Sequence, residues 1–267
     1  MSIQYDLTNE MYHLSSALSA SGAKTIAMKS LADYKHAKRD WVPAFDLGTA
    51  THTFVLEPDQ GKNVWMGPET RRGKDWSQAK AEADEAGALL LTEGDYHLAN
   101  SMAEAVWNNP HASKLLSDDG MVAEASIFAK DKATGAEIRC RPDGWIPERR
   151  IILDLKTTTQ ADPEGFGRQC ASFGYHIQEA FYRRCMRNAG EHIDRFIFIA
   201  VGKSAPYNVG VYELTEDSIA EGEAAVSYAL EQYVMATESG KWTSGHEDPR
   251  VLQIPRWAFK FTNDFDR

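Results

Sequence analysis

The sequence predicts an α/β protein in which a mixed β-sheet lies between layers of helices, preceded by a mainly helical N-terminal part. Two observations favour this class. Residues 151–156 and 195–201 are short and strongly apolar, which is typical of buried strands. Residues 175–189 and 216–237 have the apolar spacing of amphipathic helices. Helices, strands, a helix, further strands and a last helix follow one another, which favours a three-layer arrangement.

Two helices are predicted near the N-terminus. Residues 12–39 should form a loop and then a helix, with Ser19 or Ser21 as its N-cap and basic residues toward its C-terminal end, where the helix dipole favours them. Residues 46–57 should form a second helix, which Pro58 ends.

The rest of the N-terminal part contains one further strong helix signal. Residues 92–108 begin with a capping Thr92 and carry apolar side chains at helical spacing. The polar segment 61–90 before it is interpreted as an insertion of loop and short helix. The organisation that we expect is a single domain over residues 1–267, with a mainly helical part at 1–120, a core at 121–240 and a tail at 241–267.

Strand signals dominate after residue 120. Residues 123–130 and 136–141 alternate in polarity around turn residues at 131–135, which predicts a hairpin. A second turn at 143–148 and a third strand at 151–156 would extend it into a β-meander. The elements expected downstream are a helix at 175–189, a strand at 195–201, an edge strand at 209–214 and a closing helix at 216–237.

Composition limits the classes of function. The three cysteines form no C-x-x-C pair, no apolar run is long enough to cross a bilayer, and the N-terminus does not resemble a secretion signal. We therefore expect a cytoplasmic protein with reduced thiols and no membrane contact.

The net charge of −10 argues mildly against a nucleic-acid partner. Basic residues gathered on one face would remove that objection. Two clusters could form such a face or could be ordinary solvated helix surfaces: Lys24, Lys29, Lys35, Lys38 and Arg39, and the run Arg71, Arg72 and Lys74.

Two acids and a lysine interrupt the predicted strands. Asp154 and Lys156 are two residues apart, so they point to the same side of an apolar strand, and Asp143 lies in the turn before it. Charges in a buried strand are costly unless they are paired or bind a metal. An Asp–Lys pair alone is more often a structural ion pair, but the third acid favours a metal site. Oxygen ligands indicate Mg²⁺ or Mn²⁺.

These residues resemble a known signature. The stretch PD…DLK, which contains Asp143, Asp154 and Lys156, resembles that of the PD-(D/E)xK nuclease superfamily. The later stretch QEAFY resembles the Q-x-x-x-Y motif of the branch with RecB-type nucleases. Its Gln178 and Tyr182 are four apart, and therefore lie on one face of the predicted helix.

The resemblance extends over roughly residues 10–215. His52 matches the additional metal-binding histidine of the same branch. Four stretches are similar, in order, to the C-terminal nuclease domain of RecE (exonuclease VIII): YHLSSALSASGAK, FDLGTATHTFVLEP, residues 123–158 and YHIQEAFYRR.

The resemblance implies a role for each site residue. The metal ligands would be His52, Asp143, Asp154 and the Leu155 carbonyl. Glu124 matches an acidic position of related nucleases that would hold a metal-bound water or a second cation, and it could equally be an ordinary acid of the strand. Without the other motifs, His52 would be assigned to structure or surface.

The remaining roles concern the phosphate and the DNA. Lys156 would be the catalytic lysine, Gln178 would orient water or DNA, and Tyr182 would contact a phosphate. Three residues at the start of the first helix would bind a backbone phosphate, although serines there are often only caps: Ser19, Ser21 and Lys24.

The expected activity is metal-dependent hydrolysis of DNA, with Mg²⁺ or Mn²⁺ as cofactor. The resemblance to RecE implies a 5′→3′ exonuclease that acts on double-stranded ends and leaves 3′ single strands for recombination. It also implies a homo-oligomeric ring, a bacterial or phage setting and a single-strand annealing partner. The stretch from Ser21 to Thr25 lacks the first glycine of a phosphate loop, so no ATP is expected.

Two alternatives stay open. One is an endonuclease or a Cas4-like nuclease with the same site, although Cas4-like domains usually hold an iron–sulfur cluster with four cysteines and this chain has three. The other is a catalytically silent DNA-binding module, which would be expected to have lost one of the site residues.

Overall fold

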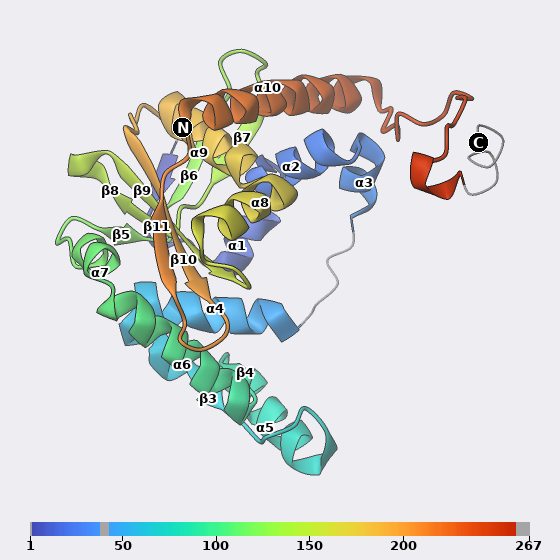
Figure 1. Ribbon diagram of the computed structural model, residues 1–267. Helices are drawn as coiled ribbons and strands as arrows, with labels where there is room; N and C mark the ends of the chain where they lie inside the picture. The colour runs from blue at the N-terminus through green and yellow to red at the C-terminus, as the bar shows by residue number, and fades with distance from the viewer. Residues whose placement is uncertain (1, 38–42, 260–267) are drawn as a thin grey trace, which may run out of the picture.

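The centre of the molecule is a five-stranded mixed sheet (Figure 1). The structure, a computed structural model, describes residues 2–37 and 43–259. The sheet has the order β11-β10-β9-β8-β5, with strands at Val122–Ala123 (β5), Gly144–Ile146 (β8), Ile151–Thr158 (β9), Arg195–Gly202 (β10) and Val209–Tyr212 (β11). β9 and β10 are parallel, and the other pairs are antiparallel. The predicted α/β class with a mixed sheet is confirmed.

Helices cover both faces of this sheet, as Figure 1 shows. Leu153, Leu155 and Ile199 pack toward α4 (Pro43–Leu56), α6 (Glu93–Asn108) and α7 (Pro110–Leu116). Their neighbours Ile152 and Phe198 pack toward α8 (Pro163–Phe173) and α9 (Tyr175–Ala189). Two separate cores result, because successive side chains of a strand point to opposite faces.

A second sheet lies on the α9 side, with the order β1-β6-β7-β2. Its strands are Ser2–Gln4 (β1), Leu18–Ser19 (β2), Ser126–Lys130 (β6) and Glu137–Cys140 (β7). The predicted hairpin is therefore real, but the predicted meander is wrong, because β6 and β7 do not belong to the sheet of β9.

One bent ribbon connects the two sheets. Ala123 pairs with Gly144 in the central sheet, and Ile127 pairs with Cys140 in the second sheet. The two pairings have the same register, so β5–β6 and β7–β8 are two long strands that bend together near Pro142. Proline has no N–H to donate, which favours a break in the ladder at this position. The turn predicted at 143–148 is thus the short strand β8.

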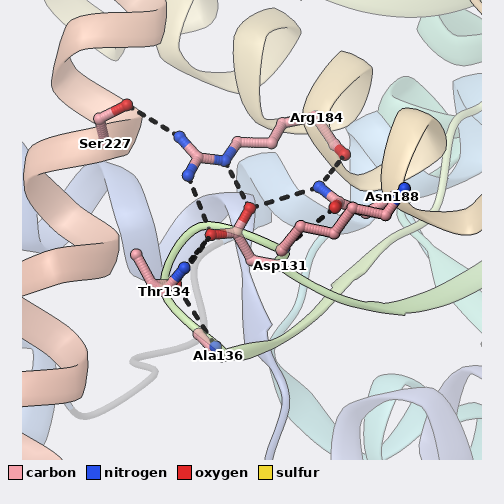
Figure 2. A network of polar contacts seen from close by, with 7 residues as sticks. Asp131, Thr134, Ala136, Arg184, Asn188 and Ser227 are labelled. Carbon is pink, nitrogen blue, oxygen red and sulfur yellow. Dashed lines mark hydrogen bonds and ion pairs between the residues drawn. The ribbon is translucent and has the colours of Figure 1, made fainter.

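Buried polar contacts fasten the far end of this ribbon to α9 (Figure 2). Asp131, which is 1% exposed, pairs with Arg184 through contacts of 2.7 and 2.9 Å. The same carboxylate accepts hydrogen bonds from Thr134 and Asn188, and Arg184 also donates to Ser227. Buried charges are stable when they are paired and hydrogen-bonded. The network therefore fixes the hairpin turn against α9.

The N-terminal part contains more short elements than expected. Its elements are α1 (Asn9–Leu14), α2 (Ala20–Met28), α3 (Leu31–His36), η1 (Pro58–Asn63), β3 (Val64–Met66), α5 (Gly73–Ala86) and β4 (Leu89–Leu91). The predicted first helix is two helices, because Ser30 caps α3 by accepting a hydrogen bond from the Asp33 N–H. Segment 61–90 holds a small parallel sheet and a 14-residue helix.

The last long helix is α10 (Glu216–Ser239), which packs on α9 and α2. Two further short 3₁₀ helices are η2 (Pro147–Arg149) and η3 (Arg256–Ala258). Among the described residues, none of the helices is both long and apolar enough to cross a membrane. Lys38 and Arg39, which the sequence placed in a basic cluster, lie outside the described residues.

Candidate active site

Three carboxylates stand in a row where the ribbon bends. Continuing the β5–β8 register by one residue places Asp143 opposite Glu124, and continuing the β8–β9 register places it opposite Asp154. Residues directly opposite in antiparallel strands point to the same face, with their Cβ atoms roughly 5 Å apart. The fold thus gathers three acids that lie up to thirty residues apart in the chain.

Local backbone contacts hold this row. The Glu124 N–H donates to the Asp143 carbonyl at 3.2 Å, and the Leu155 N–H donates to Asp143 Oδ2 at 2.7 Å. Leu155 therefore meets Asp143 through its N–H group, while ligation through its carbonyl stays a prediction. Glu124 has a φ of +52°, an uncommon conformation for this residue type, and such backbone conformations are frequent at functional sites.

His52 reaches the row from α4. Its Nδ1 lies 3.5 Å from Asp143 Oδ2. One ligand atom each from His52, Glu124 and Asp143 lies within 4.8 Å of the others. This spacing is close to that of ligand atoms around one cation with bonds of about 2.1 Å. The predicted ligands His52 and Asp143 and the more open candidate Glu124 therefore meet in the structure.

Asp154 lies next to this cluster but is not one of its three members. Its side chain is 1% exposed. Gln178 donates from Nε2 to Asp154 Oδ1 at 2.6 Å, and Lys156 Nζ lies 2.6 Å from Oδ2. Oδ2 accepts no well-directed hydrogen bond from the described residues, so the contact with Lys156 is an ion pair. The amide of Gln178 also accepts from Lys156 Nζ at 3.4 Å.

Burial and mutual repulsion shift the pKa values of the acids. Burial, with the nearby Asp143 carboxylate, raises the pKa of Glu124 to about 8. Burial also raises the pKa of Asp154, although Lys156 opposes the shift. Burial alone would lower the pKa of Lys156, but Asp154 and Asp143 outweigh it and the pKa is raised. The shifts of the two acids are due mainly to burial, whereas the raised pKa of Lys156 reflects the negative charge of the nearby carboxylates.

A divalent cation fits this environment. Three carboxylates face one ion-paired lysine, and Asp154 Oδ2 is a buried oxygen without a well-directed hydrogen bond. A bound cation would offset the excess charge and favour the ionised acids. His52, Glu124 and Asp143 are the residues that would hold it, with Asp154 adjacent.

Tyr182 has a structural contact. Its hydroxyl donates to the Arg141 carbonyl at 3.1 Å, and its ring lies 6.0 Å from that of Phe196. The bond supports the backbone just before Asp143. Contact with a phosphate stays a prediction for Tyr182, and a ligand would have to compete with Arg141 for the hydroxyl.

The start of α2 lies on the α9 side of the site. Ser19 caps α2 by accepting from the Gly22 N–H at 3.3 Å, and Ser21 is exposed within the first turn. Burial, with repulsion from Lys156, lowers the pKa of Lys24 to about 8. Lys24 is thus close enough to Lys156 for their charges to interact, while the DNA contacts of Ser19, Ser21 and Lys24 stay predictions.

Tyr175 was not anticipated as a site residue. Its ring centroid lies 4.8 Å from Lys156 Nζ and 5.7 Å from Lys24 Nζ. An aromatic residue at a helix start has no distinctive pattern in a sequence. The ring is identified only by the fold, which brings β9, α2 and α9 together.

The fold and this site define a PD-(D/E)xK-like domain: a mixed sheet flanked by helices, with the acids and the lysine at the bend and on β9. The chain belongs to the family described as a PDDEXK-like domain of unknown function (DUF3799), which matches residues 18–249.

One solved structure shares this fold, and a second was found with a lower score. A crystal structure from Eubacterium rectale, of a protein named as a proposed exonuclease, superposes with a TM-score of 0.63 at 17% identity, covering 94% of this chain and 96% of that one. A phage-related exonuclease from Haemophilus somnus has a TM-score of 0.37 at 15% identity, covering 86% and 100%. No curated protein matches the chain.

Proposed function

We propose that this protein is a metal-dependent DNA exonuclease that degrades double-stranded ends in the 5′→3′ direction and leaves 3′ single strands for recombination. One observation carries the proposal: the candidate metal-binding residues His52, Glu124 and Asp143 adjoin the Asp154–Lys156 ion pair. Metal ligands beside a lysine suit metal-dependent phosphodiester hydrolysis, because a cation there would activate water and the ammonium would offset the charge that develops on the phosphate. Polarity and end preference rest on the similarity to RecE alone.

Each residue has a defined task in this proposal. A divalent cation, Mg²⁺ or Mn²⁺, would polarise the scissile phosphate and lower the pKa of the attacking water. Lys156 stabilises the negative charge that develops on the phosphate, since its side chain is only 17% exposed and its ammonium acts in a poorly solvated site. Gln178 contacts both Asp154 and Lys156, and so sets the position of the lysine.

The negative net charge needs a separate explanation. Arg71 does not offer a free charge to DNA, because it forms ion pairs with Asp46 and Asp95. Lys24 adjoins the site instead, close enough to Lys156 for their charges to interact. We propose a homo-oligomeric ring that encloses the duplex, and a single-strand annealing protein as partner. Mass measurement in solution tests the ring, and a monomer at micromolar concentration would reject it.

The experiment that tests the activity is digestion of a linear duplex with a 5′ phosphate, labelled separately at each strand end. It compares Mg²⁺, Mn²⁺ and EDTA, and compares the natural protein with Lys156→Ala and with the control Lys114→Ala on α7. We expect metal-dependent loss of 5′-labelled ends, abolished only by Lys156→Ala. Intact closed circles support the exonuclease, and cut circles favour the endonuclease alternative. No hydrolysis of any DNA with either metal would reject the enzyme and favour a silent DNA-binding module.

A further inference from the structure

An exposed apolar surface adjoins the lysines of the candidate site. We name it the apolar ledge and define it by Met28, Phe173 and Tyr175. The side chain of Phe173 is 55% exposed and that of Met28 is 45% exposed. The Phe173 and Tyr175 rings lie 5.8 Å apart at 33°. The ledge is therefore continuous from solvent to Tyr175, which adjoins Lys156.

The geometry of this ledge is fixed by the junction of α8 and α9. Gly174, between the two aromatic residues, has a φ of +64° and ends α8 while starting α9. A Cβ atom at this position would lie 2.7 Å from Met28 Sδ and 3.1 Å from Lys24 Cδ. A side chain at this position would be strained by the backbone conformation and would have to displace Met28 and Lys24. Gly174 thus lies against α2, which packs on α9.

The interior side of the ledge is well supported. The ring of Tyr175 stacks on Phe198 of β10 at 6.0 Å and 24°, and it lies 6.0 Å from Phe166. Tyr175 is thus a half-buried ring on a rigid core. The Phe173 ring continues this group outward and is the part that solvent reaches.

The chemistry of the ledge matches one occupant. Two ammonium groups, of Lys24 and Lys156, lie near the face of Tyr175, where a phosphate would be attracted. The exposed ring of Phe173 extends the surface away from these charges. A nucleotide combines an anion and a flat apolar base in this same order, and aromatic side chains stack with any base.

We propose that the apolar ledge binds the base of a nucleotide next to the scissile phosphate, with Phe173 as the stacking residue. The inference rests on the proposed nuclease function. It adds a condition to it: unless Phe173 covers the open face of the terminal pair, the base on Phe173 has left the duplex stack, because both faces of an internal paired base are already covered. Phe173 is therefore a positioning residue that favours frayed or unpaired ends.

The test uses a short duplex with 2-aminopurine at the terminal or the second nucleotide of the strand that is degraded. Fluorescence is followed on binding in EDTA, and KM and kcat are measured with Mg²⁺. The variants are Phe173→Ala, Phe173→Trp and, as a control, Tyr228→Ala, whose side chain on α10 is 53% exposed.

We expect the fluorescence to increase on binding for the natural protein and for Tyr228→Ala, because the probe leaves the neighbouring bases that quench it. Phe173→Ala should lose this increase and raise KM about tenfold, which corresponds to about 1.4 kcal/mol, with kcat within about twofold. Phe173→Trp, whose ring also stacks on a base, should keep the natural KM. A substrate with two unpaired terminal nucleotides should be bound more tightly than a blunt one.

Failure of the inference and failure of the proposed function give different results. A natural protein that hydrolyses DNA without a fluorescence increase on binding, or a Phe173→Ala variant with an unchanged increase and KM, overturns the ledge. A natural protein that hydrolyses no DNA overturns the nuclease, whereas a fluorescence increase that depends on Phe173 would still support a nucleotide-binding ledge.

Discussion

Replacing Glu124 by glutamine should make the metal-free protein more stable while it removes a metal ligand. Burial raises the pKa of Glu124 from 4.5 to about 8. Between these two values the folded state holds a proton that the unfolded state has lost. The natural protein therefore loses stability as pH rises through this window, by about 1.4 kcal/mol per pH unit. At pH 7 the accumulated cost is about 3 kcal/mol, and Glu124→Gln removes it.

Urea unfolding in EDTA at pH 5, 6, 7 and 8 measures this effect. The free energy of unfolding of Glu124→Gln should exceed that of the natural protein by an amount that increases with pH and levels off above about pH 8. With Mg²⁺ or Mn²⁺ present, the order should reverse, because only the natural protein offers the carboxylate to the cation. Glu137→Gln, at an exposed position of β7, is the control. A difference that does not change with pH would refute the reasoning.

Three further predictions concern metal choice, the tyrosine and the hairpin. His52→Ala should weaken the binding of Mn²⁺ more than that of Mg²⁺, since imidazole suits transition metals better; equal losses in calorimetric titrations would show that His52 is not a ligand. Tyr182→Phe should lower the free energy of unfolding by about 1 kcal/mol in urea unfolding, because the hydrogen bond from the tyrosine hydroxyl to the part-buried carbonyl of Arg141 is lost. An unchanged midpoint would contradict this. Asp131→Ala should lower the free energy of unfolding, measured with urea, by about 3–5 kcal/mol, because Arg184 is left charged without its carboxylate partner. The double variant with Arg184→Met should recover part of that loss, and no recovery would mean that the two residues act independently.

The sequence predicts the long elements of this fold well. The bounds of α9 are those expected, and β9, β10 and α10 agree within a few residues, since their apolar periodicity is strong. α8 was not expected. It contains Gly165 and Gly167, which disfavour a helix, and packing of Phe166 against Tyr175 and Tyr212 stabilises it.

The short strands were less predictable for a different reason. β8 has three residues and begins with glycine, so it carries no periodicity of its own, and its pairing with β9 decides its structure. The separation of the hairpin into another sheet is equally a long-range effect. Sequence patterns report local preferences and burial, and they do not report which strand lies next to which.

The candidate site was partly predictable. The PD…DLK stretch and Gln178 are recognisable because spacing alone defines the motif, and the structure brings Gln178 to Asp154 at 2.6 Å. The position of Glu124 beside Asp143 could not be derived from the spacing of the motif, because it follows from the register of two strands whose residues lie nineteen positions apart in the chain. The backbone partner of Tyr182 could not be anticipated either, since it depends on how α9 crosses the bend.

The ribbon that connects the two sheets has a mechanical consequence. Its tip is clamped to α9 through Arg184 and Asn188, and its bend is clamped to the same helix through the Tyr182–Arg141 bond. The ribbon is therefore attached to one helix at two places, and the acids lie beside one of them. Because both attachments are made by α9, we expect a substitution that breaks the Asp131–Arg184 contact at the tip of the hairpin to shift the acids at the bend as well.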